Sequence, residues 1–132
     1  MSKLLVVEDD RTLLDVLETF LTGKGFEVKC AGDGDEALEI FSGWQADLVI
    51  TDILMPRKEG FETIRDLKRE SADIKIIAMT GGGRNDPKTY LDFAGVFGAD
   101  RALAKPFELR VLLELVEDLL GPCDEPVTVN SE

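Results

Sequence analysis

The sequence alternates short apolar runs with segments of helical periodicity five times over. The apolar runs have strand length and occupy residues 3–7, 26–30, 46–51, 74–79 and 101–104. Apolar residues recur at helical spacing within residues 13–21, 37–41, 61–67, 90–97 and 109–120. A connection that contains a helix returns the chain in its original direction, so successive strands pair in parallel. This alternation predicts an α/β fold, a three-layer sandwich with a five-stranded parallel sheet between two layers of helices.

The predicted strands differ in how continuously apolar they are. Residues 3–7, 46–51 and 74–79 are apolar almost throughout, as expected of central strands that are covered on both faces. Residues 26–30 alternate polar and apolar side chains, and residues 101–104 form a short, weak strand pattern.

Capping residues indicate where helices begin and end. Asp10 directly precedes the first helix and is interpreted as its N-cap, and Asp33 or Asp35 can cap the second. Gly121-Pro122 stops the last helix, and the stretch that follows is polar and acidic. We therefore expect one domain at residues 1–120, followed at residues 121–132 by a disordered tail or the start of a linker.

Composition restricts the partners of this domain. The 132 residues include 15 basic and 27 acidic ones, for a net charge of -12, which disfavours direct binding to nucleic acid or anionic lipid. No apolar stretch is long enough to span a bilayer, and Met1-Ser2-Lys3 leads directly into a strand pattern instead of a signal peptide. We expect a cytoplasmic protein with no membrane partner.

The absence of histidine excludes several site chemistries. With no histidine in the sequence, His-based acid–base catalysis, Ser-His-Asp triads and histidine zinc sites are not available. Cys30 and Cys123 lie in unlike contexts, so we interpret them as one buried and one exposed free thiol. Carboxylates, hydroxyls, lysines and a hard cation are left to form a site.

Polar residues stand where several of the predicted strands end. Glu8 and Asp9 follow the first strand, Asp52 the third, Thr80 the fourth and Lys105 the fifth. The carboxyl ends of parallel strands meet at one edge of the sheet, where α/β proteins bind ligands. Three carboxylates there would repel one another unless a cation joined them, and oxygen ligands suit Mg²⁺ or Mn²⁺. With a threonine hydroxyl and a lysine ammonium, the set fits a phosphoryl group.

Each of these residues also has a plainer interpretation when it is taken alone. Thr80 could cap a turn, and a lysine before a proline, as Lys105 is, usually lies on the surface. The glycines at residues 81–83 are interpreted as a flexible loop, because the nucleotide-binding patterns Gly-x-x-x-x-Gly-Lys-Ser/Thr and Gly-x-Gly-x-x-Gly are absent. The combination of residues, in its order along the chain, carries more weight than any one of them.

With this combination assembled, residues 3 to 120 resemble the receiver domain of bacterial two-component response regulators. The resemblance is carried by four spaced motifs: Val7-Glu8-Asp9; Asp52 with Met55-Pro56 and Gly60; Thr80-Gly81; and Lys105-Pro106-Phe107. It implies a flavodoxin-like (βα)5 sandwich. It also implies a signalling phosphoacceptor and not a turnover enzyme, which catalyses only its own phosphorylation and slow dephosphorylation.

The resemblance further implies roles for individual residues. Asp52 would accept the phosphoryl group from a phosphohistidine of a sensor kinase or a phosphotransfer protein. Glu8, Asp9 and Asp52, with the backbone carbonyl of Leu54, would hold Mg²⁺, Glu8 mainly through water. Phosphoryl oxygens would be bound by Lys105 and Thr80, and Gly81 would leave access to Asp52. The movement of Thr80 would pass the signal to a downstream protein or output domain, and homodimerisation is left open.

Two features depart from the family pattern. Ala102 stands where the family usually has an aromatic residue that moves with the threonine. The loop at residues 81–86 is also longer than is common, so we hypothesise that phosphorylation orders this loop and the helix after it.

Two other functions remain as alternatives. A receiver that no longer takes phosphate could act only as an interaction module, which Ala102 favours and the intact acidic, threonine and lysine set disfavours. A haloacid-dehalogenase-type phosphohydrolase shares a strand-end aspartate, but it needs a second acid two residues later, where this chain has Leu54.

Overall fold

The computed structural model describes residues 2–53, 60–80 and 98–121. Its strands are β1 (Lys3–Val7), β2 (Glu27–Ala31), β3 (Leu48–Asp52), β4 (Lys75–Thr80) and β5 (Arg101–Ala104). Its helices are α1 (Arg11–Gly23), α2 (Gly34–Gly43), α3 (Gly60–Glu70) and α5 (Leu109–Leu120). The helix predicted over residues 90–97, the loop at residues 81–86 and the tail after Gly121 lie outside the described residues.

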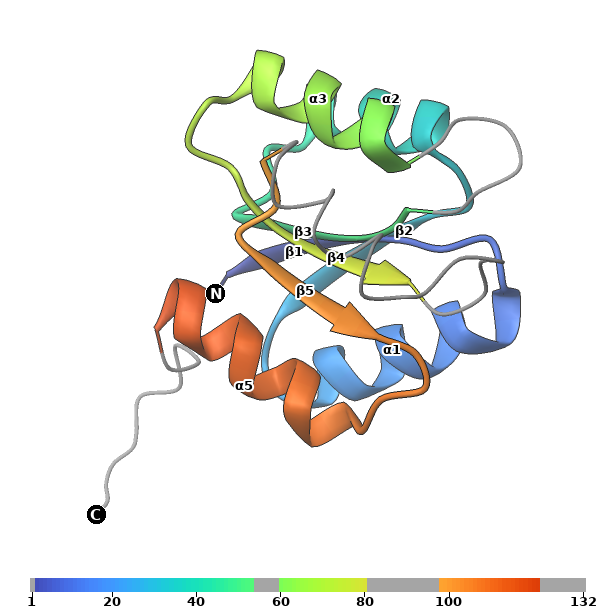
Figure 1. Ribbon diagram of the computed structural model, residues 1–132. Coiled ribbons are helices and arrows are strands. Elements are labelled where there is room, and N and C mark those ends of the chain that lie inside the picture. The colour runs from blue at the N-terminus through green and yellow to red at the C-terminus, as the bar shows by residue number, and fades with distance from the viewer. Residues whose placement is uncertain (1, 54–59, 81–97, 122–132) are drawn as a thin grey trace.

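The five strands form one parallel sheet in the order β2-β1-β3-β4-β5 (Figure 1). This is the flavodoxin-like strand order, and it confirms the predicted α/β sandwich. The three strands predicted to be central, β1, β3 and β4, are the interior strands, whereas β2 and β5 form the two edges. Continuous apolar runs occupy the interior because strands there are covered on both faces.

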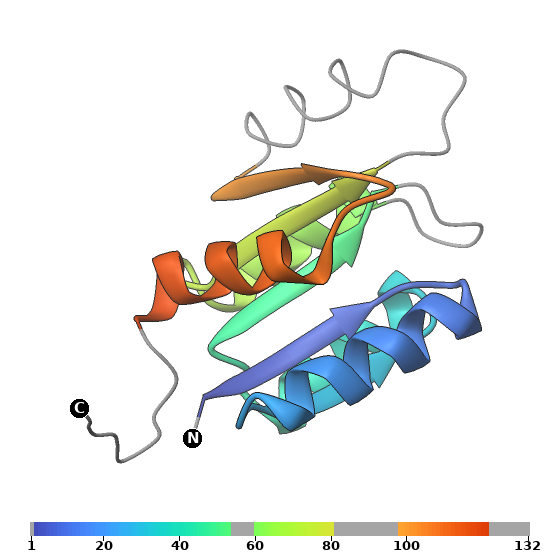
Figure 2. The same cartoon turned by 90° about the horizontal axis from the view of Figure 1, so that it is seen from below.

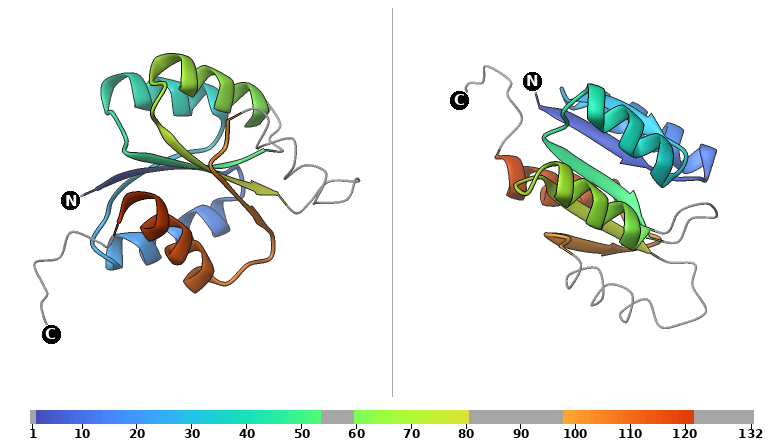
Figure 3. Two further views of the ribbon diagram at one scale, coloured as in Figure 1. Left: turned by 60° about the vertical axis from the view of Figure 1, so that its left-hand side comes forward. Right: turned by 90° about the horizontal axis from the view of Figure 1, so that it is seen from above.

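Two layers of helices cover the sheet. Seen from below, α1 and α5 lie across one face (Figure 2), and seen from above, α2 and α3 lie across the other (Figure 3). Within the described ranges, no helix is both long and apolar enough to traverse a bilayer.

Alternation of side chains along each strand divides the core into two halves. In β1, Leu4 and Val6 pack with α1 and α5, while Leu5 and Val7 pack with α2 and α3. All four side chains are fully buried. This interior strand therefore contributes to both layers, which fixes the register of the sheet between them.

The helix caps agree with the sequence. The Asp10 carboxylate accepts hydrogen bonds from the backbone N–H groups of Thr12 and Leu13, so Asp10 is the N-cap of α1, as predicted. Of the two candidates for α2, it is Asp33 that caps the helix, through the N–H of Glu36. Gly121 ends α5 with a φ of 86°, a left-handed conformation that favours glycine.

Candidate functional site

The ends of three strands deliver the polar residues of the site to one edge of the sheet. Glu8 directly follows β1, Asp52 is the last residue of β3, and Lys105 directly follows β5. The Glu8 N–H donates to the carbonyl of Ala31, which continues the β1–β2 ladder by one residue and holds the glutamate backbone in line with the strand. The site is therefore built on the rigid sheet and on the first residues beyond it.

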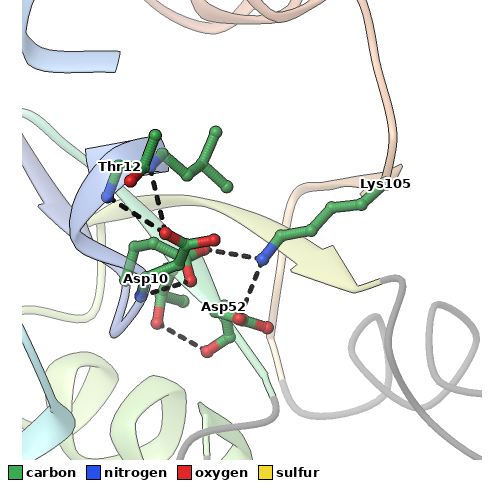
Figure 4. A network of polar contacts seen from close by, with 7 residues as sticks. Asp10, Thr12, Asp52 and Lys105 are labelled. Atoms are coloured by element: carbon green, nitrogen blue, oxygen red, sulfur yellow. Dashed lines mark hydrogen bonds and ion pairs between the residues drawn. The ribbon is translucent and has the colours of Figure 1, made fainter. Parts of the chain in front are cut away.

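Lys105 joins two carboxylates that are far apart in the sequence. Its Nζ lies 2.7 Å from Oε1 of Glu8 and 3.0 Å from Oδ2 of Asp52. Figure 4 shows the lysine side chain reaching from the segment after β5 toward Asp52, with Asp10 and Thr12 at the start of α1 beside it. The ammonium bridges the ends of β1 and β3 across the site.

Glu8 is the most deeply buried acid of the site, with 1% of its surface exposed. Its Oε1 accepts from Lys105 and its Oε2 accepts from the backbone N–H of Asp10 at 3.1 Å, so both carboxylate oxygens have partners. Burial raises the pKa of Glu8 above its ordinary value, and the nearby charge of Asp52 adds to this, while the bonds from Lys105 and the Asp10 N–H act in the opposite direction.

The charge of Lys105 is favoured by its two partners. Burial alone would lower the pKa of Lys105, but the hydrogen bonds to Glu8 and Asp52 outweigh it and raise the pKa above the ordinary value. Lys105 therefore carries its positive charge at neutral pH.

Three carboxylates of the site fit a divalent cation. Oxygens of Glu8, Asp9 and Asp52 all lie within 4.8 Å of one another, and Asp9 is the exposed member of the three. An octahedral Mg²⁺ with bonds of about 2.1 Å spans about 4.2 Å between opposite ligands, so a small contraction would bring these oxygens into range. Three carboxylates and one ammonium leave two negative charges, which a divalent cation neutralises.

The structure does not describe every residue that was predicted for the site. Leu54 and Gly81 lie outside the described residues, and Thr80 is described only as the last residue of the β4 backbone. Ala102 is exposed on β5, paired in register with Ala78.

A cleft of about 780 Å³ extends from the acids to the space between α1 and the start of α5. Its far part contains apolar side chains that sequence analysis did not assign to a site, among them Leu13, Val16, Phe107 and Leu109. Val16 is 43% exposed and is the exposed large apolar residue of the described chain. Its position off the buried 14–17–21 stripe of α1 was the signal that could have revealed it.

Comparison with known proteins decides the family. The model of the response regulator receiver domain matches residues 4–117. The chain belongs to this family. As a receiver, it is a member of a group whose domains are generally signalling phosphoacceptors and not true enzymes.

The receiver has relatives among whole regulators. It is 38% identical over 125 residues to a probable transcriptional regulator, ycf27, of Cyanophora paradoxa, which covers 94% of this chain and 50% of that protein. It is 31% identical over 120 residues to the response regulator SaeR of Staphylococcus aureus, which covers 91% of this chain and 51% of SaeR. The chain thus spans about half the length of these relatives.

Solved receivers share the fold along most of the chain. The chemotaxis protein CheY4 of Vibrio cholerae matches with a TM-score of 0.81 at 29% identity, covering 90% of this chain and 98% of that one. The receiver domain of NtrX from Brucella abortus matches with a TM-score of 0.82 at 26% identity, covering 89% of this chain and 97% of the NtrX chain.

Proposed function

We propose that this receiver accepts a phosphoryl group on Asp52 from a sensor histidine kinase or a phosphotransfer protein. The observation that carries the proposal is the ammonium of Lys105, held 3.0 Å from the Asp52 carboxylate at the edge where two further acids converge. A carboxylate flanked by a fixed cation and by ligands for a second one is suited to a multiply charged phosphoryl group.

The proposed transfer requires few groups of this chain. An Asp52 carboxylate oxygen attacks phosphorus, a P–O bond forms, and the P–N bond of the donor phosphohistidine breaks. The imidazole leaves with the electron pair of that bond. The 132 residues contain no histidine, so the donor phosphohistidine lies outside them. Lys105 would turn from the carboxylates to a phosphoryl oxygen and offset the added negative charge.

Glu8, Asp9 and Asp52, together with the Leu54 carbonyl, are proposed to hold Mg²⁺ or Mn²⁺. When bound, the ion supplies charge neutralisation for the phosphoryl oxygens. Glu8 already uses one oxygen for Lys105 and the other for the Asp10 N–H, which supports a role for Glu8 through water and not through a direct bond.

The proposed readout uses residues on the neighbouring strands. Thr80 would bind the phosphoryl group and Gly81 would leave room for it, so that phosphorylation draws the end of β4 inward. Ala102 supplies no aromatic group for this movement, so the signal would pass mainly through the residues after Thr80. The receiver, residues 1–120, would then act in the cytoplasm on a downstream protein or an output domain, and residues 121–132 would begin the linker to it.

Intact-mass spectrometry tests the phosphoacceptor. Incubating the protein with acetyl phosphate and Mg²⁺ should add one phosphoryl group, and Asp52→Ala should remove the adduct. Asp66→Ala, a substitution of an acid on α3, is the matched control and should retain it. An adduct of equal yield on Asp52→Ala, or none on the unsubstituted protein, would overturn the proposal.

The same preparation tests the metal site. Isothermal titration with MgCl₂ should give one binding event that Asp9→Asn weakens by about tenfold or more, since a direct charged ligand is lost. Glu8→Gln should weaken it less, because Glu8 is proposed to act through water. Equal losses for the two variants would contradict the proposed ligand arrangement.

A further inference from the structure

A threonine hydroxyl is buried directly beside the proposed phosphoacceptor. Thr51 is fully buried in β3, a strand in which all five residues are buried. The strand residues before it are Leu48, Val49 and Ile50, so the strand is otherwise apolar up to Asp52. Valine has nearly the shape of threonine and would fill this place without a hydroxyl that needs a hydrogen bond in the interior. Packing alone therefore does not account for a threonine at this position.

The hydroxyl of Thr51 binds the backbone of Asp52. Its Oγ1 donates to the Asp52 carbonyl oxygen at 3.0 Å, in a buried hydrogen bond. This bond joins the side chain of the preceding residue to the carbonyl that follows the Asp52 Cα, so it closes a ring that contains the φ and ψ rotations of Asp52. Away from water, such a bond is electrostatically stronger than an exposed one. It therefore restricts the backbone conformation of the phosphoacceptor itself.

The peptide unit between Asp52 and Ile53 is held from its other side as well. The Ile53 N–H donates to the carbonyl of Met79 on β4 at 3.0 Å. This peptide bond is trans, so its carbonyl points away from β4. Pairing of β3 with β1 ends at Val7 and Thr51, whereas pairing with β4 includes Asp52. The Thr51 hydroxyl thus supplies a hydrogen bond at Asp52 on the side where the β1 ladder has ended.

The direction of the Asp52 carboxylate depends on this backbone conformation. Its Oδ2 lies 3.0 Å from Nζ of Lys105 (Figure 4), and a carboxylate oxygen of Asp52 lies within 4.8 Å of oxygens of Glu8 and Asp9. A displacement of about 1 Å at a reacting group can lower a rate by about 100-fold. A small rotation of the Asp52 backbone would therefore affect both its attack on phosphorus and its share in binding a cation.

We propose that Thr51 is a positioning residue: its buried hydroxyl holds the Asp52 backbone in the conformation that directs the carboxylate to Lys105 and to the proposed cation site. The inference rests on the proposed phosphorylation of Asp52. Side chains alternate along β3, so Thr51 lies on the face of Val49 and Ile53, opposite to the face that carries the Asp52 carboxylate. Thr51 therefore acts through the backbone and does not touch the phosphoryl group.

A comparison of Thr51→Val with Thr51→Ser tests the role of the hydroxyl. Thr51→Val keeps the shape and removes the hydrogen bond, so Mg²⁺ affinity by isothermal titration should fall by about two- to tenfold. The rate of phosphoryl adduct formation from acetyl phosphate, followed by intact mass at saturating MgCl₂, should fall by at least about the same factor. Thr51→Ser keeps a hydroxyl and should recover most of both losses.

Amide hydrogen exchange of Ile53 tests the same hydrogen bond without cation or phosphodonor. The Ile53 N–H belongs to the peptide unit whose carbonyl accepts from Thr51. Its exchange should be faster by about two- to tenfold in Thr51→Val, because that peptide unit is then held from one side only. Thr51→Ser should restore the slower exchange.

Thr63→Val is the matched control. It makes the same substitution at the other fully buried threonine of the described residues, on α3. This variant should leave Mg²⁺ affinity and phosphorylation unchanged. Urea denaturation establishes that each variant is folded under the assay conditions. Thr51→Ala, which also lacks the hydroxyl, gives the same comparison with Thr51→Ser if the valine variant does not fold.

Three results would overturn the proposal. Thr51→Val could bind Mg²⁺ and take the phosphoryl group as the unsubstituted protein does. Thr51→Ser could be as impaired as Thr51→Val, which would assign the effect to packing of the methyl group. Thr63→Val could be impaired to the same extent, which would assign it to any lost buried hydroxyl. Absence of an adduct on the unsubstituted protein would instead overturn phosphorylation of Asp52, and Ile53 exchange would then decide the role of Thr51.

Discussion

At the scale of single residues, Lys105 is the cation that lets buried acids coexist at the site. Glu8 is 1% exposed and Asp52 is 6% exposed, and the same ammonium bonds to both. Removing one member of a buried ion pair costs more than the pair itself contributes, because a charge is left without compensation. The stability of the receiver is therefore coupled to the residues proposed to carry its chemistry.

Lys105→Ala should lower the free energy of unfolding of the metal-free protein by about 1–3 kcal/mol. This loss is smaller than the loss on breaking a fully buried pair, because solvent reaches the lysine. Urea denaturation in EDTA measures this change. Arg110→Ala is the control, since the Arg110–Glu114 pair is 68% and 62% exposed and should contribute less than about 0.5 kcal/mol. Equal effects of the two substitutions would contradict the compensating role of Lys105.

Cys30 is a third residue with a shifted pKa, and its side chain is half-buried, not fully buried as the sequence suggested. Burial and the neighbouring Glu18 carboxylate raise its pKa from 9.0 to about 11. In a Cys123→Ser background, the rate of alkylation by iodoacetamide should still be rising at pH 10, because only the thiolate reacts. Glu18→Gln should shift the profile to lower pH.

The raised pKa of Cys30 also makes the stability of the protein depend on pH. Between about pH 9 and 11 the folded thiol keeps its proton while the unfolded thiol has lost it, so the contribution of Cys30 to stability falls as the pH rises through this window. An alkylation profile that levels off at pH 9 would disprove the raised pKa.

At the scale of secondary structure, the turn between β1 and α1 serves the helix and the site together. The Asp10 carboxylate caps α1, while the Asp10 N–H donates to Glu8. The start of the helix and the orientation of the buried glutamate are thus set by one residue through different groups. Asp9 stands between them and is directed to the exposed side of the acidic cluster.

Asp10→Ala should therefore lower the free energy of unfolding by about 0.5–2 kcal/mol, the usual cost of a lost N-cap. Asp10→Ser keeps a capping oxygen and should stay within a few tenths of a kcal/mol of the original protein. Thermal or urea unfolding distinguishes the two. If the alanine variant were as stable as the serine variant, the cap would contribute nothing measurable.

At the scale of the whole molecule, the two edges of the sheet differ from its centre in backbone pairing. The Glu27 N–H donates to the Ser2 carbonyl, and the Ala31 carbonyl accepts from the Glu8 N–H. Alternate residues of β2 therefore direct their backbone N–H and carbonyl groups toward β1. The N–H groups of Val28 and Cys30 consequently point away from the sheet. In β3, by contrast, both sides of the strand are paired.

Amide hydrogen exchange followed by NMR should reflect this difference. The amides of Val28 and Cys30 should exchange faster than those of Val49 and Ile50 by on the order of 100-fold or more, because the central strand opens only with the whole domain. Uniform protection across β2 and β3 would contradict the argument from pairing.

Much of this arrangement could be predicted because it depends on local patterns. The continuous apolar runs identified β1, β3 and β4 as central strands, and Asp10 was identified as a cap from its place before an apolar helix. Strand ends placed Glu8, Asp9, Asp52 and Lys105 at one edge. Asp33 and Asp35 both stand at the start of an apolar helix, and which of them caps it depends on the residue at which the first turn begins. The partial exposure of Cys30 could not be predicted, because it depends on packing between elements.

The sequence alone determined the alternation of strands and helices, the parallel sheet and the residue types at its carboxyl edge, because each depends on periodicity or on position within one element. Tertiary structure decided how those residues meet. Lys105 bridges Glu8 and Asp52, which lie 97 and 53 residues away, and the Trp44 ring lies within 5.8 Å of lysine ammonium groups from two strands. Such contacts depend on the order of strands in the sheet and on the distances between layers, and periodicity along the chain encodes neither.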